Sequence, residues 1–175
     1  LDSIPSGLRC GRSSCCGKVS GGWASASGAV SSTLLLPAGD AAPWMQGCEM
    51  TTYRYYAGGA VVAAADASAH RMLVAGGNGA DNTPLDTCEL YDAAADRWST
   101  QEAHLPQPMC CHAAPITGGS TVLVVQLDDR KNTGCALLDV RSGSESWQPM
   151  KSPENARSFH AIAAVGEFSV VILGG

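Results

Sequence analysis

Short apolar runs alternate with polar, glycine-containing turns along most of the chain. Residues 111 to 147 show this pattern best, because they predict strands over His112–Ile116, Thr121–Leu127 and Cys135–Val140, and a fourth strand that carries Trp147. Short strands separated by Gly, Ser and Asn turns are typical of all-β domains. Since no segment shows a convincing helical period with caps, we expect little helix.

The pattern repeats at intervals near 50 residues. Tryptophans and double glycines mark the repeat: Trp44, Trp98 and Trp147 lie 54 and 49 residues apart, while Gly76-Gly77 and Gly174-Gly175 lie 98 apart. A shift of 103 residues also places Trp44 on Trp147 and Arg54 on Arg157. A lone sheet has two apolar faces, so repeated sheets stacked face against face would bury both. We expect the glycines to allow close backbone approach, and Tyr91 and the tryptophans to fill the gaps between sheets.

One repeat is similar to a known family. The segments Leu73-Val-Ala-Gly-Gly77 and Cys88-Glu-Leu-Tyr-Asp92, followed by Trp98 and His112, resemble a kelch repeat. Residues 157–175 resemble the start of another, whereas Gln126-Leu127 stands where the family has its double glycine. The resemblance implies an all-β, kelch-type β-propeller with four-stranded antiparallel blades, incomplete in this chain. Residues 32–175 would hold about two complete blades plus partial blades, and residues 1–31 a degenerate partial blade or an extension.

Composition and charge narrow the classes of partner. The net charge is −5, and the 16 acidic and 11 basic residues form no block of like charge, which disfavours binding to nucleic acid or to an anionic membrane. The longest apolar runs are far shorter than the roughly 20 residues that span a bilayer. The segment Leu-Asp-Ser-Ile-Pro at the start does not have the basic and apolar parts of a signal peptide. We therefore expect no signal peptide, and we expect the eight cysteines to be reduced thiols in a cytoplasmic protein, with association with the cytoskeleton as one variant.

Two arginines and two polar loops are candidate partner-binding sites. The kelch resemblance implies that arginines near the central channel, here Arg54 and Arg157, pair with acidic peptides; the alternative is that they bind backbone carbonyls within the fold. Loops between the second and third strands of a repeat provide the other candidates, with ordinary solvated connections as the alternative. The candidate loop residues are Asn78, Asp81, Asn82, Asp128, Arg130 and Lys131.

The sequence gives little support for catalysis or metal binding. Cys110 and Cys111 are adjacent, and adjacent residues on a strand point to opposite faces, so we expect no metal site there. Tyr53, Tyr55 and Tyr56 suggest a copper enzyme like galactose oxidase, but no His pair has ligand spacing. We therefore expect no catalytic residue and no cofactor.

Three functional hypotheses follow from these observations. The first is a non-catalytic protein–protein interaction scaffold that binds a partner through loops on one face, as a substrate adaptor or as a cytoskeletal or assembly scaffold. The second is a structural subunit buried in a large complex. The third and least favoured is the copper enzyme. A fold does not determine a function, so the identity of a partner needs evidence from the site itself.

Overall fold

Four antiparallel sheets make up the part of the chain that the structure describes. The computed structural model describes residues 15–24, 28–37, 43–63, 70–126, 134–140, 146–154, 160–167 and 169–174. The first sheet has the order β1-β2-β3, the second β4-β5-β6-β7, the third β8-β9-β10-β11 and the fourth β12-β13. The only helical element within these ranges is a three-residue 3-10 turn, η1 (Thr117–Gly119). The predicted all-β class is therefore confirmed.

The strands of the first two sheets are β1 (Cys15–Ala24), β2 (Gly28–Pro37), β3 (Met45–Gly47), β4 (Gly58–Ala63), β5 (His70–Ala75), β6 (Cys88–Asp92) and β7 (Arg97–Thr100). Those of the other two are β8 (Cys111–Ile116), β9 (Thr121–Gln126), β10 (Cys135–Asp139), β11 (Gln148–Pro149), β12 (Ala161–Val165) and β13 (Ser169–Leu173). The expected boundary between residues 31 and 32 lies inside β2, which pairs with β1 along most of its length. Strands β1 and β2 thus pair with each other across that boundary.

The third sheet agrees closely with the repeat read from the sequence. Strands β8, β9 and β10 match the three predicted apolar strands to within one residue at most ends, and the fourth strand, β11, begins directly after Trp147. The turn between the first two of these strands is η1, in which Gly118 and Gly119 have φ of 64° and 83°. These left-handed conformations favour glycine, which explains why the turn falls at this pair.

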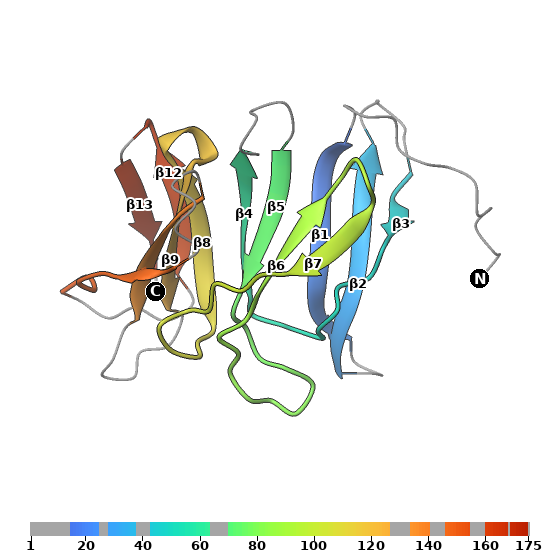
Figure 1. Cartoon of the computed structure of the whole chain (residues 1–175), viewed down its shortest axis with the longest axis horizontal. Coiled ribbons are helices and arrows are strands. Elements are labelled where there is room, and N and C mark those ends of the chain that lie inside the picture. The colour runs from blue at the N-terminus through green and yellow to red at the C-terminus, as the bar shows by residue number, and fades with distance from the viewer. Residues whose placement is uncertain are drawn as a thin grey trace.

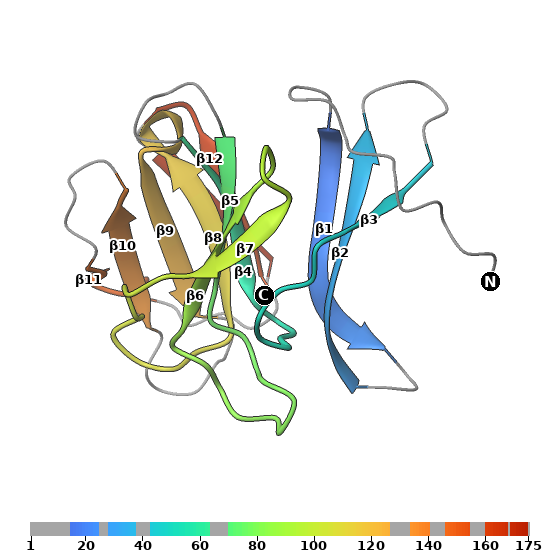
Figure 2. The ribbon, with the colours of Figure 1, turned by 45° about the vertical axis from the view of Figure 1, so that its right-hand side comes forward.

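The sheets stand side by side, as Figures 1 and 2 show. The first strands of the second, third and fourth sheets are neighbours, since β4 contacts β8 and β8 contacts β12. Three connecting segments, residues 48–57, 76–87 and 101–110, lie at one end of the row, at the lower side of Figure 1. We call this end the loop face. The turns β8–β9 and β12–β13 lie at the opposite end.

Trp98 fills the gap between the first and second sheets. Its ring packs on Tyr91, with 5.1 Å between ring centroids, and shares a buried cluster with Leu35 and Met50 of the preceding sheet and its connector. The indole N–H donates to Thr33 Oγ1 at 3.0 Å and to the Cys48 carbonyl at 3.1 Å. The ring is therefore packed against apolar neighbours, and its N–H is hydrogen-bonded.

Trp147 repeats this arrangement one sheet further along, but Trp44 does not. Trp147 is buried with Leu138 of its own sheet and with Val62 and Leu73 of the preceding sheet. Trp44, by contrast, is 48% exposed, which corrects the expectation that it fills a gap between sheets. Each buried tryptophan packs against the sheet that precedes its own, and no described sheet precedes β1–β3.

No helix in the described part of the chain is long and apolar enough to cross a membrane.

The two tryptophan environments predict different costs of truncation. Trp98→Ala should lower the free energy of unfolding by about 3–5 kcal/mol, because it removes a buried ring and leaves a cavity. Trp44→Ala is the matched control and should change it by less than about 0.5 kcal/mol, because the ring is half exposed. Urea unfolding followed by circular dichroism measures both, and equal costs would contradict the packing described here.

Candidate functional site

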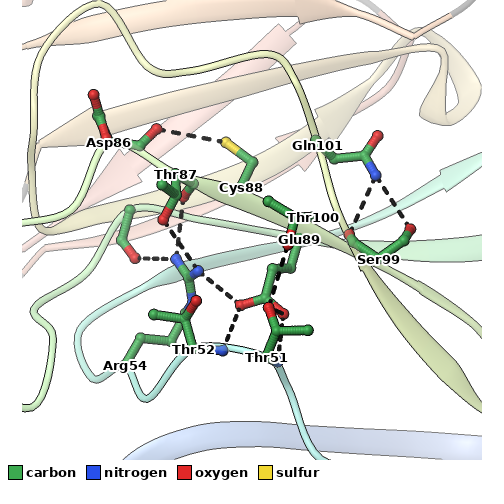
Figure 3. Close-up of polar contacts among 11 residues, drawn as sticks. Thr51, Thr52, Arg54, Asp86, Thr87, Cys88, Glu89, Ser99, Thr100 and Gln101 are labelled. Atoms are coloured by element: carbon green, nitrogen blue, oxygen red, sulfur yellow. Dashed lines mark hydrogen bonds and ion pairs between the residues drawn. The ribbon is translucent and has the colours of Figure 1, made fainter.

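Arg54 lies four residues before β4 and is completely buried. Its Nη1 donates to the carbonyls of Gly76 at 2.8 Å and Thr87 at 3.1 Å, and its Nη2 lies 2.8 Å from Glu89 Oε1 (Figure 3). The prediction that Arg54 binds a partner is therefore wrong, because the side chain has neither exposure nor donors directed to solvent. The alternative, an arginine bound to backbone carbonyls within the fold, is what the structure contains.

Glu89, in β6, is the anion that compensates this buried cation. Its side chain has no exposure, and its Oε2 accepts hydrogen bonds from the backbone N–H and the hydroxyl of Thr51, each at 2.7 Å. Its Oε1 also accepts from the Thr52 N–H at 3.1 Å. Burial alone would raise the pKa of Glu89, but the hydrogen bonds from Thr51 and Arg54 hold it below its ordinary value. The pair therefore fastens the 48–57 connector to the second sheet.

The double glycine at the end of β5 brings the connectors of the loop face together. Gly76 and Gly77 have φ of 63° and 90°. A Cβ at Gly76 would lie 2.4 Å from the Met109 carbonyl oxygen, and one at Gly77 would lie 2.7 Å from the Tyr55 carbonyl oxygen. Only glycine satisfies both the conformation and the space at these positions. Gly174 also has a positive φ, of 73°, while Gly175 lies outside the described residues.

Asn78 holds the loop face together from within. Its backbone N–H and C=O exchange hydrogen bonds with the backbone of Tyr55 at 2.8 and 3.0 Å, and its Oδ1 accepts from Cys110 Sγ at 3.1 Å. The Tyr55 hydroxyl donates to Oδ1 of Asn82, which lies four residues after Asn78 in the same loop. The three connectors are thus joined to one another by hydrogen bonds.

Asp81 and Asn82 lie at the exposed tip of the loop. Asp81 Oδ1 accepts from the hydroxyl of Thr83 at 2.6 Å and from its N–H at 3.2 Å, and these bonds lower the pKa of Asp81. Asn82 has a φ of 63°, a conformation that Asn tolerates better than most residues. Both side chains are therefore presented by a loop with defined internal bonds. The remaining candidates, Asp128, Arg130, Lys131 and Arg157, lie outside the described residues.

Two exposed tyrosines belong to the same surface, and sequence reasoning did not place them there. Tyr53 and Tyr56 are 52% and 56% exposed, and the ring of Tyr56 lies 5.1 Å from that of Tyr55. Tyr56 also has a φ of 55°, which is unusual for an aromatic residue. The only signal in the sequence is the presence of three tyrosines within four positions, which suggests copper ligands as readily as an exposed surface.

The described residues contain no group of three or more His, Cys, Asp or Glu side chains placed to hold a metal ion. None of the five cysteines whose side chains are described forms a disulfide. Burial raises the pKa of the Cys88 thiol to about 11 and that of the Cys111 thiol to about 12, so both are protonated at neutral pH. His112 and His160, which the sequence places in matching positions, lie with their rings 5.3 Å apart.

Comparison with known proteins supports the fold and leaves the family open. No protein-family model matches the chain, and no curated protein matches it. A similar solved structure is that of YjhT, with a TM-score of 0.62 and 14% sequence identity. The match covers 78% of this chain and 49% of that chain, so the present chain spans about half the length of the structure that it resembles. At this identity the likeness concerns the fold alone.

The buried ion pair predicts a large cost when one partner is removed. Arg54→Met should lower the free energy of unfolding by about 3–5 kcal/mol, because it leaves the Glu89 carboxylate buried without its cation. The double variant Arg54→Met/Glu89→Leu should lose less than the two single variants together. Urea unfolding of all three variants measures the coupling, and additive losses would contradict a direct interaction.

The lowered pKa of Glu89 also predicts a pH dependence. A carboxyl whose pKa is lower in the folded state stabilises fully above its unfolded pKa, and this contribution is lost as the pH falls through the folded value. The loss should begin near the ordinary value of 4.5 and increase below it. Glu89→Gln should therefore lose less stability than the wild type between pH 5 and about 3. A parallel decline in both proteins would show that Glu89 does not contribute.

The double glycine predicts a difference between two matched substitutions. Gly118→Ala places a Cβ at a φ of 64° with no atom within 4 Å, so it should cost only the conformational penalty of about 1–2 kcal/mol. Gly76→Ala, at a φ of 63°, adds a collision with the Met109 carbonyl and should cost about 1–3 kcal/mol more. Thermal unfolding measures the difference, and equal costs would mean that the close approach is not required.

Proposed function

We propose that this chain is part of a kelch-type β-propeller that acts as a non-catalytic protein–protein interaction scaffold. The repeated sheets, the adjacent first strands and the buried Trp98 and Trp147 between sheets all support the propeller. The partner would bind at the loop face. Use as a substrate adaptor and use as a cytoskeletal or assembly scaffold would both employ this surface.

The observation that carries the proposal is a set of exposed side chains on connectors whose backbone is held by buried hydrogen bonds. Tyr53, Tyr56, Asp81 and Asn82 are exposed, while the Arg54–Glu89 pair and the bonds of Asn78 hold the connectors that bear them. Tyrosine is enriched in protein interfaces because it offers a large contact area with few rotatable bonds. A preorganised surface loses less entropy when it binds.

A cytoplasmic site of action fits the cysteines. The five described cysteine side chains include the exposed Cys48 and form no disulfide among themselves, as is usual in a reducing compartment. A cytoplasmic location is part of the proposal.

The structural-subunit alternative rests on a different surface, the fourth sheet. Val165, Val171 and Leu173 are 53%, 38% and 59% exposed, and the register of β12 and β13 places them on one face of this hairpin. An apolar sheet face of this kind is typical of a surface covered by another protein.

Site-specific photocross-linking in cells distinguishes the two hypotheses. A photoreactive phenylalanine derivative would replace Tyr56 on the loop face, Val171 on the fourth sheet or, as a control, Trp44. The scaffold proposal predicts a defined cross-linked protein from position 56 and none from position 44. Cross-links from position 171 alone would favour the structural subunit and contradict the scaffold.

A further inference from the structure

We infer that the partner segment bound by the loop face is basic and presents arginine side chains to Tyr53, Tyr56 and Asp81. This inference rests on the proposed function and adds the chemistry of the partner. It reverses the charge expected from the sequence, where Arg54 was a candidate for capturing acidic peptides. The reversal follows from the burial of Arg54, which is neutralised by Glu89 and has no contact with solvent.

The accessible charge of the loop face is acidic. Among residues 48–57, 76–87 and 101–110, Arg54 is the only lysine or arginine, and it is buried. The same segments expose the carboxylates of Asp81, Asp86 and Glu102, and Asp86 lies 3.3 Å from the imidazole of His104. In the next connector, the described residues 150–154 hold one base and one acid, Lys151 and Glu154, which leaves the balance unchanged.

The aromatic residues favour a cation for a second reason. The faces of exposed tyrosine rings attract cations, and guanidinium groups do so more often than ammonium groups because they are planar and weakly hydrated. The position of Tyr56 is fixed by its carbonyl, which accepts from the Cys111 N–H at 3.2 Å. Its ring adjoins that of Tyr55, whose hydroxyl binds Asn82 beside Asp81. Tyr56 and Asp81 are therefore linked through Tyr55 and Asn82.

The loop face would repel an acidic partner segment. The carboxylates of such a segment would approach Asp81, Asp86 and Glu102 without an accessible cation in these three connectors to pair with. Like charges at an interface are a common means of rejecting wrong partners. Asp81 is well suited to this role because its hydrogen bonds from Thr83 keep it ionised.

Binding of matched peptides tests the inference. Fluorescein-labelled 12-residue peptides of Gly and Ser would carry four arginines, four citrullines or four glutamates at the same positions, and fluorescence anisotropy would measure their binding to the full chain. We expect the arginine peptide to bind at least tenfold more tightly than the citrulline peptide. We expect no binding of the glutamate peptide, and a weaker arginine complex at higher salt.

Variants locate the binding on the loop face. Tyr53→Ala/Tyr56→Ala should weaken binding of the arginine peptide at least fivefold, whereas Tyr56→Phe should retain it because the ring remains. Asp81→Asn should weaken binding and reduce its salt dependence. Trp44→Ala, which removes an exposed ring elsewhere, and Glu167→Gln, which removes a carboxylate at the β12–β13 turn, should each remain within twofold of the wild type. Unchanged circular dichroism and melting temperature would confirm that each variant is folded.

Two results of the binding experiments would overturn the inference. One is an arginine peptide that binds no better than the citrulline peptide, and the other is a loss of binding in Glu167→Gln equal to that in Asp81→Asn. A partner photocross-linked at position 56 through an acidic segment would also overturn it, while leaving the scaffold proposal intact. The absence of any cross-link at position 56 would instead contradict the scaffold proposal itself.

Discussion

The buried contact between the Arg54 guanidinium and the Glu89 carboxylate joins three parts of the chain that are distant in sequence. Arg54 comes from the connector before β4 and binds the carbonyls of Gly76 and Thr87 at the two ends of the 76–87 loop. Glu89 binds the backbone of the same connector at Thr51 and Thr52. A buried charge is tolerated only when it is paired and hydrogen-bonded, so these contacts depend on one another. The exposed groups of the loop face depend on them in turn.

The packing between sheets supplies the second constraint. Trp98 and Trp147 each fill the space between their own sheet and the preceding one, and the double glycine at Gly76 lets the connectors approach beneath them. The apolar interior and the polar loop face are thus positioned by the same repeat. This explains why Trp98, Trp147 and Gly76, which mark the repeat in the sequence, are structural, while the residues that we propose to contact a partner lie between them.

Much of the fold could be predicted from the sequence because its signals are local. The apolar runs of β8, β9 and β10, the glycine turn at Gly118 and the positive φ of Gly76 depend on near neighbours. The sequence offered two roles for Arg54 and could not decide between them, because its partner Glu89 is 35 residues away on another strand. Trp44 shares the sequence pattern of Trp98 but has no preceding described sheet to cover it. The exposure of Tyr53 and Tyr56 likewise depends on how the connectors meet.

Hydrogen exchange of single amides tests most directly whether the ion pair holds the loop face in place. The N–H groups of Gly77 and Asn78 donate to carbonyls of the other two connectors at 2.9 and 2.8 Å, and that of Leu85 donates to Gly77 within its own connector at 2.7 Å. Amides within β9 serve as an internal reference. We predict slow exchange of these three amides in the wild type. In Arg54→Met their exchange should accelerate more than that of β9. Fast exchange in the wild type, or equal acceleration of the loop and β9 amides in the variant, would contradict the account.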